Sequence, residues 1–477
     1  MPALDKITAF AARVLGRARE NKSADLAYSL HRETTNEKAL RHIADGNALE
    51  DAGRLAEARE QYENAIKLAP GLARAHLNYG NVLLAMDQPE EAISVYSTAL
   101  HWQSDLAAAH LNIGNAHTLC NRLHDAIQSY DEALAIKPDF VDAWVAKGNV
   151  QGDLKNPDAA IECYQMALKL QPDYAEVLLN LGNTFRAMNR PKEAVNCFNQ
   201  VLAHFPESPE LHRSLGLAYK VLDRPVEAIS SFQRAVELKK SYVDAHIDLA
   251  NTYRELGSID KAVETARLAR DLDPDNSGAW SLLLFCLSDD DRIDKRELFA
   301  EHRNFGKHFE HLLVSSSGNH KNSKEPDRIL RVGFVSGDLR NHAVASFFEP
   351  LLQLFLEMRS LSIYIYETSG LEDDTTRRIK SAVSFWKDVE TLSNGRLFQL
   401  IQSDRIDILI DLSGHTPANR LLVFARKPAP VQMSWIGYPG TTGLKAVDYY
   451  VGDKHFLPSE EYDEFFKNFG LQLKFGV

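Results

Sequence analysis

The amino-acid sequence repeats with a period of 34 residues, and this period restricts the fold more than any other feature. A small residue marks the same phase of each unit: Gly46, Gly80, Gly114, Gly148, Gly182, Gly216 and Ala250. Sixteen residues after the marker, six of the seven units carry an aromatic residue: Tyr62, Tyr96, Tyr130, Tyr164, Phe198 and Phe232. Units of this length predict small supersecondary elements that stack, because one unit cannot bury its apolar face alone.

Each unit is expected to be a pair of helices. The small residues let the two helices approach closely, and the aromatic residue fills the space between hairpins. A proline ends the second helix in five units: Pro70, Pro138, Pro172, Pro206 and Pro274. The period and these residues resemble the tetratricopeptide repeat. The resemblance implies a right-handed superhelix with a concave, peptide-binding surface and no chemistry of its own.

Composition excludes several classes of protein. The net charge of −12 argues against nucleic-acid binding, which needs a basic face. No run of eighteen apolar residues is present, so no membrane span is expected. The cysteines, namely Cys120, Cys163, Cys197 and Cys286, lack metal-ligand spacing and predict buried thiols in a reducing cytoplasm. We expect neither a metal site nor a cofactor.

The period ends near residue 276, and the organisation changes there. We expect N-terminal helices at 1–38, seven repeats at 39–276, capping helices at 277–313, a polar linker at 314–327 and an α/β lobe at 328–477. Strands are predicted at 329–336, 361–366, 406–412, 431–436 and 448–451. Helices are predicted at 342–358, 375–385, 395–404 and 419–426. This alternation predicts a parallel, Rossmann-like sheet whose ligands bind beyond the carboxyl ends of the strands. Residues 336–342, 413–420 and 437–443 would share that rim.

Three sequence blocks on this rim, 331–342, 411–416 and 426–443, resemble the O-linked N-acetylglucosamine transferase family, in particular its bacterial members. The resemblance implies the first, acceptor-side lobe of a two-lobed GT-B catalytic region. The family's donor-binding lysine and its His/Thr/Thr/Asp segment have no counterpart before residue 477, and residues 464–477 fit the family poorly. We therefore expect this chain to lack the donor-binding lobe.

The resemblance assigns roles to residues on the rim. His342 and His415 are the predicted catalytic residues. Substrate contacts are predicted for Asn341, Thr416, Arg420, Gly437, Tyr438, Pro439, Gly440 and Thr441. Simpler interpretations stay open: a helix-terminal residue for His342, an ordinary turn for His415, a helix cap for Thr416, a solvated charge for Arg420 and a tight glycine turn for 437–443. Asp338 and Asp407 are weaker base candidates, since a strand-end aspartate more often caps a turn.

The repeats add a candidate peptide-binding row. An asparagine follows the marker in six units: Asn47, Asn81, Asn115, Asn149, Asn183 and Asn251. At this position we favour a bond to the neighbouring hairpin. Three residues before some of these lie Asn78, Asn112 and Asn180, which we predict to contact the peptide main chain, as in the resembled family.

The functional expectation follows from both halves of the chain. A complete protein of this kind would transfer a sugar, N-acetylglucosamine by the resemblance, from a UDP-sugar to Ser or Thr of proteins held by the repeats. The UDP-sugar is a co-substrate, and protein acceptors are the expected partners, without nucleic acid or membrane. The alternative is a non-catalytic scaffold for protein–protein interaction.

Overall fold

The structure, a computed structural model, describes residues 35–313, 320–452 and 473–474. It divides into two compact units, residues 1–206 and 207–477, each of which is described by itself. The helices predicted within 1–34, the linker residues 314–319 and most of 464–477 lie outside the described residues. None of the described helices is long and apolar enough to cross a membrane.

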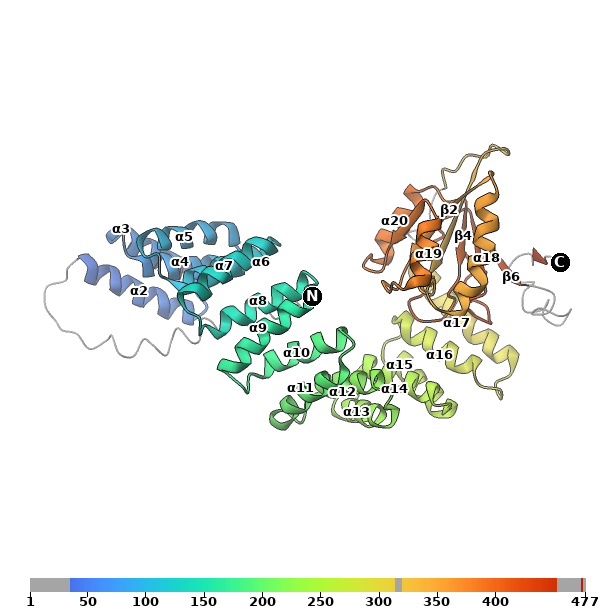
Figure 1. The fold of residues 1–477 in the computed structure, drawn as a ribbon, viewed down its shortest axis with the longest axis horizontal. Helices are drawn as coiled ribbons and strands as arrows, with labels where there is room; N and C mark the ends of the chain where they lie inside the picture. The colour runs from blue at the N-terminus through green and yellow to red at the C-terminus, as the bar shows by residue number, and fades with distance from the viewer. Residues whose placement is uncertain (1–34, 314–319, 453–472, 475–477) are drawn as a thin grey trace. The chain divides into compact units, whose positions relative to one another are not determined.

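The described part of the first unit consists of helical hairpins (Figure 1). They are α2 (Thr35–Asp51) with α3 (Leu55–Leu68), α4 (Ala73–Ala85) with α5 (Pro89–Trp102), α6 (Ala107–Leu119) with α7 (Leu123–Ile136), α8 (Val141–Asp153) with α9 (Pro157–Leu170), and α10 (Ala175–Ala187) with α11 (Pro191–His204). The second unit begins with two more hairpins, α12 (Pro209–Val221) with α13 (Pro225–Leu238) and α14 (Val243–Glu255) with α15 (Ile259–Leu272). These are the helix pairs that the 34-residue period predicts.

The marker glycines lie directly against the aromatic ring of their own hairpin. A Cβ atom added to Gly114 would lie 2.4 Å from Cε1 of Tyr130, whose side chain is 1% exposed. The same contact, at 2.4 to 2.7 Å, joins Gly46, Gly80, Gly148, Gly182 and Gly216 to Tyr62, Tyr96, Tyr164, Phe198 and Phe232. The repeat therefore needs glycine here because the ring occupies the space of a side chain.

Valine in place of Gly114 is expected to lower the free energy of unfolding of the first unit by about 3 kcal/mol, because Tyr130 has no room to move inside its hairpin. The matched control is Gly152→Ala in α8, where no atom lies within 4 Å of the added Cβ; it should stabilise the helix by roughly 0.5–1 kcal/mol. Urea unfolding followed by circular dichroism measures both. Equal effects of the two substitutions would contradict the packing argument.

The second unit continues with α16 (Ser277–Ser288) and α17 (Lys295–Leu313), then a seven-stranded sheet. The strands are β1 (Leu330–Ser336), β2 (Leu361–Glu367), β3 (Phe385–Asp388), β4 (Ile408–Asp411), β5 (Val431–Trp435), β6 (Tyr449–Gly452) and β7 (Leu473–Lys474). The helices between them are α18 (Ala343–Glu357), α19 (Asp374–Ala382), α20 (Asn394–Ser403) and α21 (Leu421–Phe424).

All pairings in the sheet are parallel, in the order β3-β2-β1-β4-β5-β6-β7. The chain starts in the middle, moves out to β3 and returns to β4, so the order reverses between β1 and β4. In doubly wound sheets, ligands bind at the carboxyl ends of the strands at this reversal. The predicted fold class, tetratricopeptide helices followed by a Rossmann-like α/β lobe, is confirmed.

Two differences from the predicted elements have local causes. The strand β3 was not predicted, because its four residues lie at the sheet edge and only two of them are even half-buried. The predicted helix at 419–426 is shorter, covering only Leu421–Phe424.

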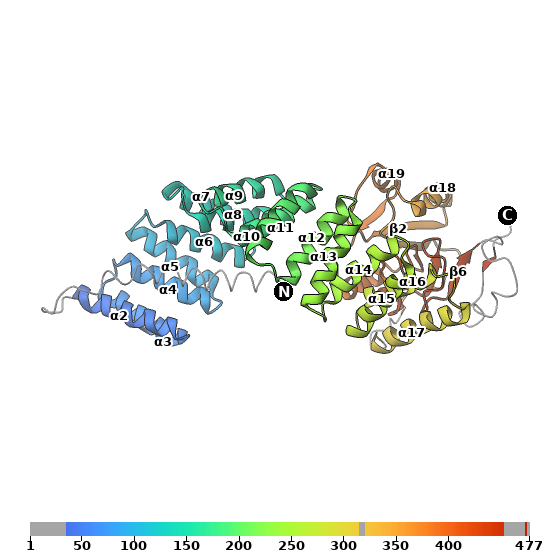
Figure 2. The same ribbon diagram turned by 90° about the horizontal axis from the view of Figure 1, so that it is seen from below.

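The two faces of the sheet have separate cores. On one face Val332 and Phe334 of β1 pack with Phe348 and Leu352 of α18. On the other face the core contains residues of β2, α20 and α21 and also of α16 and α17, namely Trp280, Leu284, Phe305 and Phe309. Helices α16 and α17 accordingly lie beside the sheet in both views (Figures 1 and 2). The predicted capping helices thus share the hydrophobic core of the lobe.

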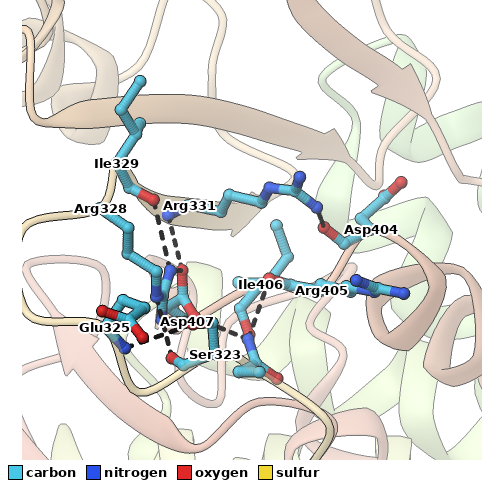
Figure 3. A network of polar contacts seen from close by, with 10 residues as sticks. Ser323, Glu325, Arg328, Ile329, Arg331, Asp404, Arg405, Ile406 and Asp407 are labelled. Atoms are coloured by element: carbon cyan, nitrogen blue, oxygen red, sulfur yellow. Dashed lines mark hydrogen bonds and ion pairs between the residues drawn. The ribbon is translucent and has the colours of Figure 1, made fainter.

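A polar network closes the amino-terminal edge of the sheet. Asp407 accepts two hydrogen bonds from the Arg328 guanidinium at 2.6 Å, and one each from the Asn322 amide and the Arg331 backbone N–H (Figure 3). Burial favours a higher pKa for Asp407, but these hydrogen bonds outweigh it and hold the pKa below its usual value. Asp407 therefore fastens the segment before β1 to the sheet, and the interpretation of a structural aspartate holds over that of a base.

Candidate functional site

A pocket of about 610 Å³ lies at the carboxyl ends of the strands. Its walls come from the segments that follow β1, β2, β3 and β4, and from α14 and α16. The lining residues are Gly337, Asp338, Arg340, His342, Thr368, Ser369, Leu371, Glu390, Thr416, Pro417, Ala418, Arg254 and Phe285. Two of the three predicted rim segments, 336–342 and 413–420, thus contribute to one pocket.

His342 is the N-cap residue of α18. Its Nδ1 accepts a hydrogen bond from the Val344 backbone N–H at 3.3 Å and lies 4.0 Å from Oδ1 of Asp338. The His342 side chain is 39% exposed, so a ligand in the pocket can reach it. The neighbouring Asn341 is exposed and donates its backbone N–H to Asp373 at 2.6 Å, which ties the loop to α19. Both the helix-terminal interpretation and access to the pocket therefore apply to His342.

Thr416 lines the pocket and donates its hydroxyl to the carbonyl oxygen of Ser413 at 2.9 Å. It caps no helix, because the N-cap residue of α21 is Arg420. The pocket position agrees with the substrate contact that the sequence predicts for Thr416.

His415 requires a correction, because its side chain is 1% exposed. Its Nδ1 is 3.1 Å from the Ser281 hydroxyl of α16, and its Nε2 is 3.1 Å from the carbonyl oxygen of Thr442. The ring points back from the strand end into the contact with α16 and α17. Both nitrogens are used inside the protein, so the expected contact with acceptor or sugar is wrong for this geometry.

The segment 437–443 also requires a correction. Tyr438 is 2% exposed, and its hydroxyl contacts the Ser288 hydroxyl at 2.6 Å and Nε2 of His302 at 2.9 Å. A Cβ at Gly437 would lie 1.7 Å from the carbonyl oxygen of Leu412. The close backbone approach that we expected toward a substrate is made instead toward β4 and α17. The remaining predicted contacts, Pro439, Gly440 and Thr441, do not line the described pocket and stay predictions.

Arg420 is neither a solvated charge nor a residue of the pocket. Its guanidinium donates to the backbone carbonyls of Val389, Glu390 and Leu392, at 2.7 to 3.1 Å. Burial lowers the pKa of Arg420. The expected substrate contact is corrected to a structural role: Arg420 holds the loop that brings Glu390 to the pocket.

Two arginines line the pocket, and each has an acidic neighbour. The Arg254 guanidinium lies 3.1 Å from Oδ2 of Asp289 and 4.1 Å from the centre of the Phe285 ring. Arg340 lies 3.8 Å from Oδ1 of Asp338. With Glu390 as a further carboxylate, the pocket does not concentrate positive charge. Nothing in the sequence around Arg254 or Phe285 indicated this position, because both lie outside the motif blocks.

In the first unit, asparagine side chains of successive repeats are hydrogen-bonded to one another. The hydroxyls of Tyr62, Tyr96, Tyr130 and Tyr164 donate to Asn47, Asn81, Asn115 and Asn149, respectively, within one hairpin. The expected bond to the neighbouring hairpin is the one that Asn47, Asn81 and Asn149 accept from an asparagine of the next repeat. The amide groups of Asn78, Asn112 and Asn180 donate to the asparagine of the preceding repeat at 2.8 to 3.0 Å. Asn112 is only 5% exposed. The peptide contact of Asn78, Asn112 and Asn180 stays a prediction, with Oδ1 as the group available to a peptide N–H.

Comparisons with known proteins agree with this arrangement. The model of glycosyl transferase family 41 matches residues 266–472, and tetratricopeptide repeat models match segments between residues 49 and 284. The family 41 match begins in α15 and so includes α16 and α17, in agreement with the core that they share with the lobe.

Among sequence relatives, a probable UDP-N-acetylglucosamine–peptide N-acetylglucosaminyltransferase SPINDLY of Petunia hybrida is 34% identical over 186 residues, which are 38% of this chain and 20% of that protein. The probable transferase SEC of Arabidopsis thaliana is 35% identical over 130 residues, 27% of this chain and 13% of that protein. The matched part of the chain thus spans about a fifth or less of these relatives.

Among solved structures, a mutant O-GlcNAc transferase of Thermobaculum terrenum matches with a TM-score of 0.56 and 29% identity, covering 63% of this chain and 57% of that one. Tetratricopeptide repeats joined to a family 41 region are common to the sequence, the fold and these matches. The chain thus combines tetratricopeptide repeats with a region that matches glycosyl transferase family 41, and it is similar in this combination to the tetratricopeptide-repeat O-linked N-acetylglucosamine transferases.

Proposed function

We propose that this chain forms the acceptor-side part of a protein O-glycosyltransferase. The enzyme transfers N-acetylglucosamine from a UDP-sugar to Ser or Thr of proteins that the repeats bind, in the reducing cytoplasm. One observation carries the proposal: His342 and Thr416, from separate family motifs, line one pocket at the reversal of the sheet, together with Arg254 from the last repeat hairpin. The hairpin of α14 and α15 therefore supplies part of the pocket wall, and an acceptor chain bound along this hairpin would lie next to the pocket.

The charges of the pocket support the acceptor side over the donor side. An inverting transfer needs an oriented hydroxyl, a route for its proton and stabilisation of the leaving diphosphate. Arg254 and Arg340 each face an acidic neighbour, so neither is an unpaired cation for a diphosphate. A neutral peptide segment with a hydroxyl fits these walls, and His342 is the accessible group that can exchange a proton with it. Stabilisation of the leaving group falls to residues that bind the donor.

Peptide binding by the repeats rests on the asparagine row. Asn78 and Asn180 are partly exposed, and each uses its amide N–H toward the neighbouring repeat, so its carbonyl oxygen can accept a peptide N–H. Such contacts do not depend on the side chains of the bound peptide, which suits an enzyme with many protein substrates.

The test titrates the purified chain with UDP-N-acetylglucosamine and other nucleotide sugars by calorimetry, and then assays sugar transfer to a Ser/Thr peptide library by mass spectrometry. Because the proposal assigns only the acceptor side to this chain, transfer that His342→Ala abolishes is the expected result when a family 41 donor-binding lobe is supplied with the UDP-sugar. Micromolar binding of UDP-N-acetylglucosamine by the chain alone would instead place a donor site on it. Binding of peptides without any transfer under these conditions, by a chain that is folded by circular dichroism, would establish the scaffold. The paired state of Arg254 and Arg340 is the observation that favours this second function.

A further inference from the structure

Two groups compete for one nitrogen of His342. The Val344 backbone N–H donates to Nδ1 at 3.3 Å, at the long end for such a bond. Oδ1 of Asp338 lies 4.0 Å from the same atom. A backbone N–H only donates and a carboxylate only accepts, so the two contacts require opposite tautomers of the imidazole. The contact with Val344 requires the proton on Nε2, whereas a contact with Asp338 requires it on Nδ1.

The tautomer decides what His342 can do in the pocket. With the proton on Nε2, this nitrogen can only donate a hydrogen bond. With the proton on Nδ1, the lone pair of Nε2 is free to accept a proton from an acceptor hydroxyl. The helix-capping contact and a role as general base are therefore mutually exclusive states of the same side chain.

The surroundings of Asp338 suit it to control this choice. Asp338 is 8% exposed and lines the same pocket as His342. Its backbone N–H donates to the Ser336 hydroxyl at 3.0 Å, which fixes the turn after β1. Arg340, 3.8 Å from Oδ1, is the cation that faces Asp338 in the pocket. A movement of about 1 Å would bring Oδ1 within hydrogen-bonding distance of Nδ1.

We propose that Asp338 is the positioning residue that draws the proton to Nδ1 of His342 and so turns Nε2 into the base. This assignment rests on the proposed function. In the transfer step the Ser or Thr oxygen bonds to the anomeric carbon of the nucleotide sugar. The bond from that carbon to the diphosphate oxygen breaks, and its electron pair leaves with the diphosphate. The hydroxyl proton passes to Nε2, and the Asp338 carboxylate stabilises the resulting imidazolium through the Nδ1 proton.

The test measures the tautomer directly, by long-range ¹H–¹⁵N NMR of the full chain, with the His342 signal identified from its absence in His342→Gln. In Asp338→Asn we expect the ratio of Nδ1-protonated to Nε2-protonated imidazole to fall about fivefold, because a carboxylate accepts a hydrogen bond more strongly than an amide does. Glu390→Gln removes a carboxylate from the same pocket and is the matched control. It should leave the tautomer ratio unchanged.

The same ratio in the wild type and in Asp338→Asn, or an equal fall in Glu390→Gln, would overturn the assignment. In a transfer assay, Asp338→Asn should lower kcat while peptide affinity stays the same, whereas a merely structural role would lower both. The NMR result needs no nucleotide sugar. If the tautomer responds to Asp338 but no sugar is transferred, the proposed function fails and the pairing stands.

Discussion

Alanine in place of Gly306 is expected to lower the free energy of unfolding of the second unit by about 3 kcal/mol or more. Helix α17 crosses the segment 437–443 with no side chain at the contact, and a Cβ at Gly306 would lie 1.9 Å from the carbonyl oxygen of Gly443. The obstacle is backbone, so no rotamer change relieves it. Gly443 cannot be replaced by another residue either, since its φ is +76° and an added Cβ would lie 1.9 Å from the carbonyl oxygen of His302. Urea unfolding followed by tryptophan fluorescence measures the loss.

Gly395→Ala serves as the control in the same unit. Its added Cβ meets nothing closer than 3.7 Å, and position 395 lies in the first turn of α20, where alanine should change stability by less than about 1 kcal/mol. The packing of α17 against the lobe would be in doubt if Gly306→Ala were as mild as this control.

Acidification from pH 7 to pH 5 is expected to lower the free energy of unfolding of the second unit by roughly 3 kcal/mol through three buried groups. Burial lowers the pKa of His302 to about 4, and burial together with the charge of His302 lowers the pKa of His415 well below its usual value. The unfolded chain takes up protons at these positions below about pH 6.5, but the folded chain does not. Each histidine therefore removes roughly 2 kcal/mol of stability at pH 5.

Asp411 acts in the opposite direction. Burial raises its pKa to about 6, so the folded state takes up a proton before the unfolded state does and gains about 1 kcal/mol on the same change of pH. In the double variant His302→Gln/His415→Gln, the loss of stability between pH 7 and pH 5 should disappear. Chemical unfolding at each pH provides the measurement. An unchanged pH dependence in the double variant would show that other groups cause the acid sensitivity.

The sequence predicts the repeats and most of the sheet because both signals are local. The glycine and the aromatic residue that pack together are sixteen residues apart in the same hairpin. The central strands contain largely apolar runs, residues 332–335 in β1 and 363–366 in β2, as expected for strands covered on both faces. The edge strand β3 was missed because exposed edges carry no such run.

Only part of the site was predicted, because only some of its contacts follow from local sequence signals. His342 and Thr416 each follow a strand, and the carboxyl ends of these strands lie at the same edge of the sheet. The sheet topology therefore brings both residues to one pocket. His415 and Tyr438 also follow strands, but residues of α16 and α17, more than a hundred positions earlier, cover them. A glycine-rich turn looks the same in sequence whether a ligand or a helix approaches it. Gly306, a glycine inside α17 directly after the apolar Phe305, is the local sign of that helix contact.

The core that α16 and α17 share with the sheet also determines where a chimeric protein can be joined without breaking the fold. A chimera joined in the polar stretch at 314–327 would remove Trp280, Phe305 and Phe309 from the lobe and leave apolar surface exposed. A junction upstream of α14 keeps those helices and retains Arg254 and Phe285 in the pocket wall. Because hairpins stack mainly on their neighbours, units upstream of that point can be added, lost or exchanged as whole 34-residue cassettes. The surface of the repeats can then diversify while the residues that line the pocket stay constant.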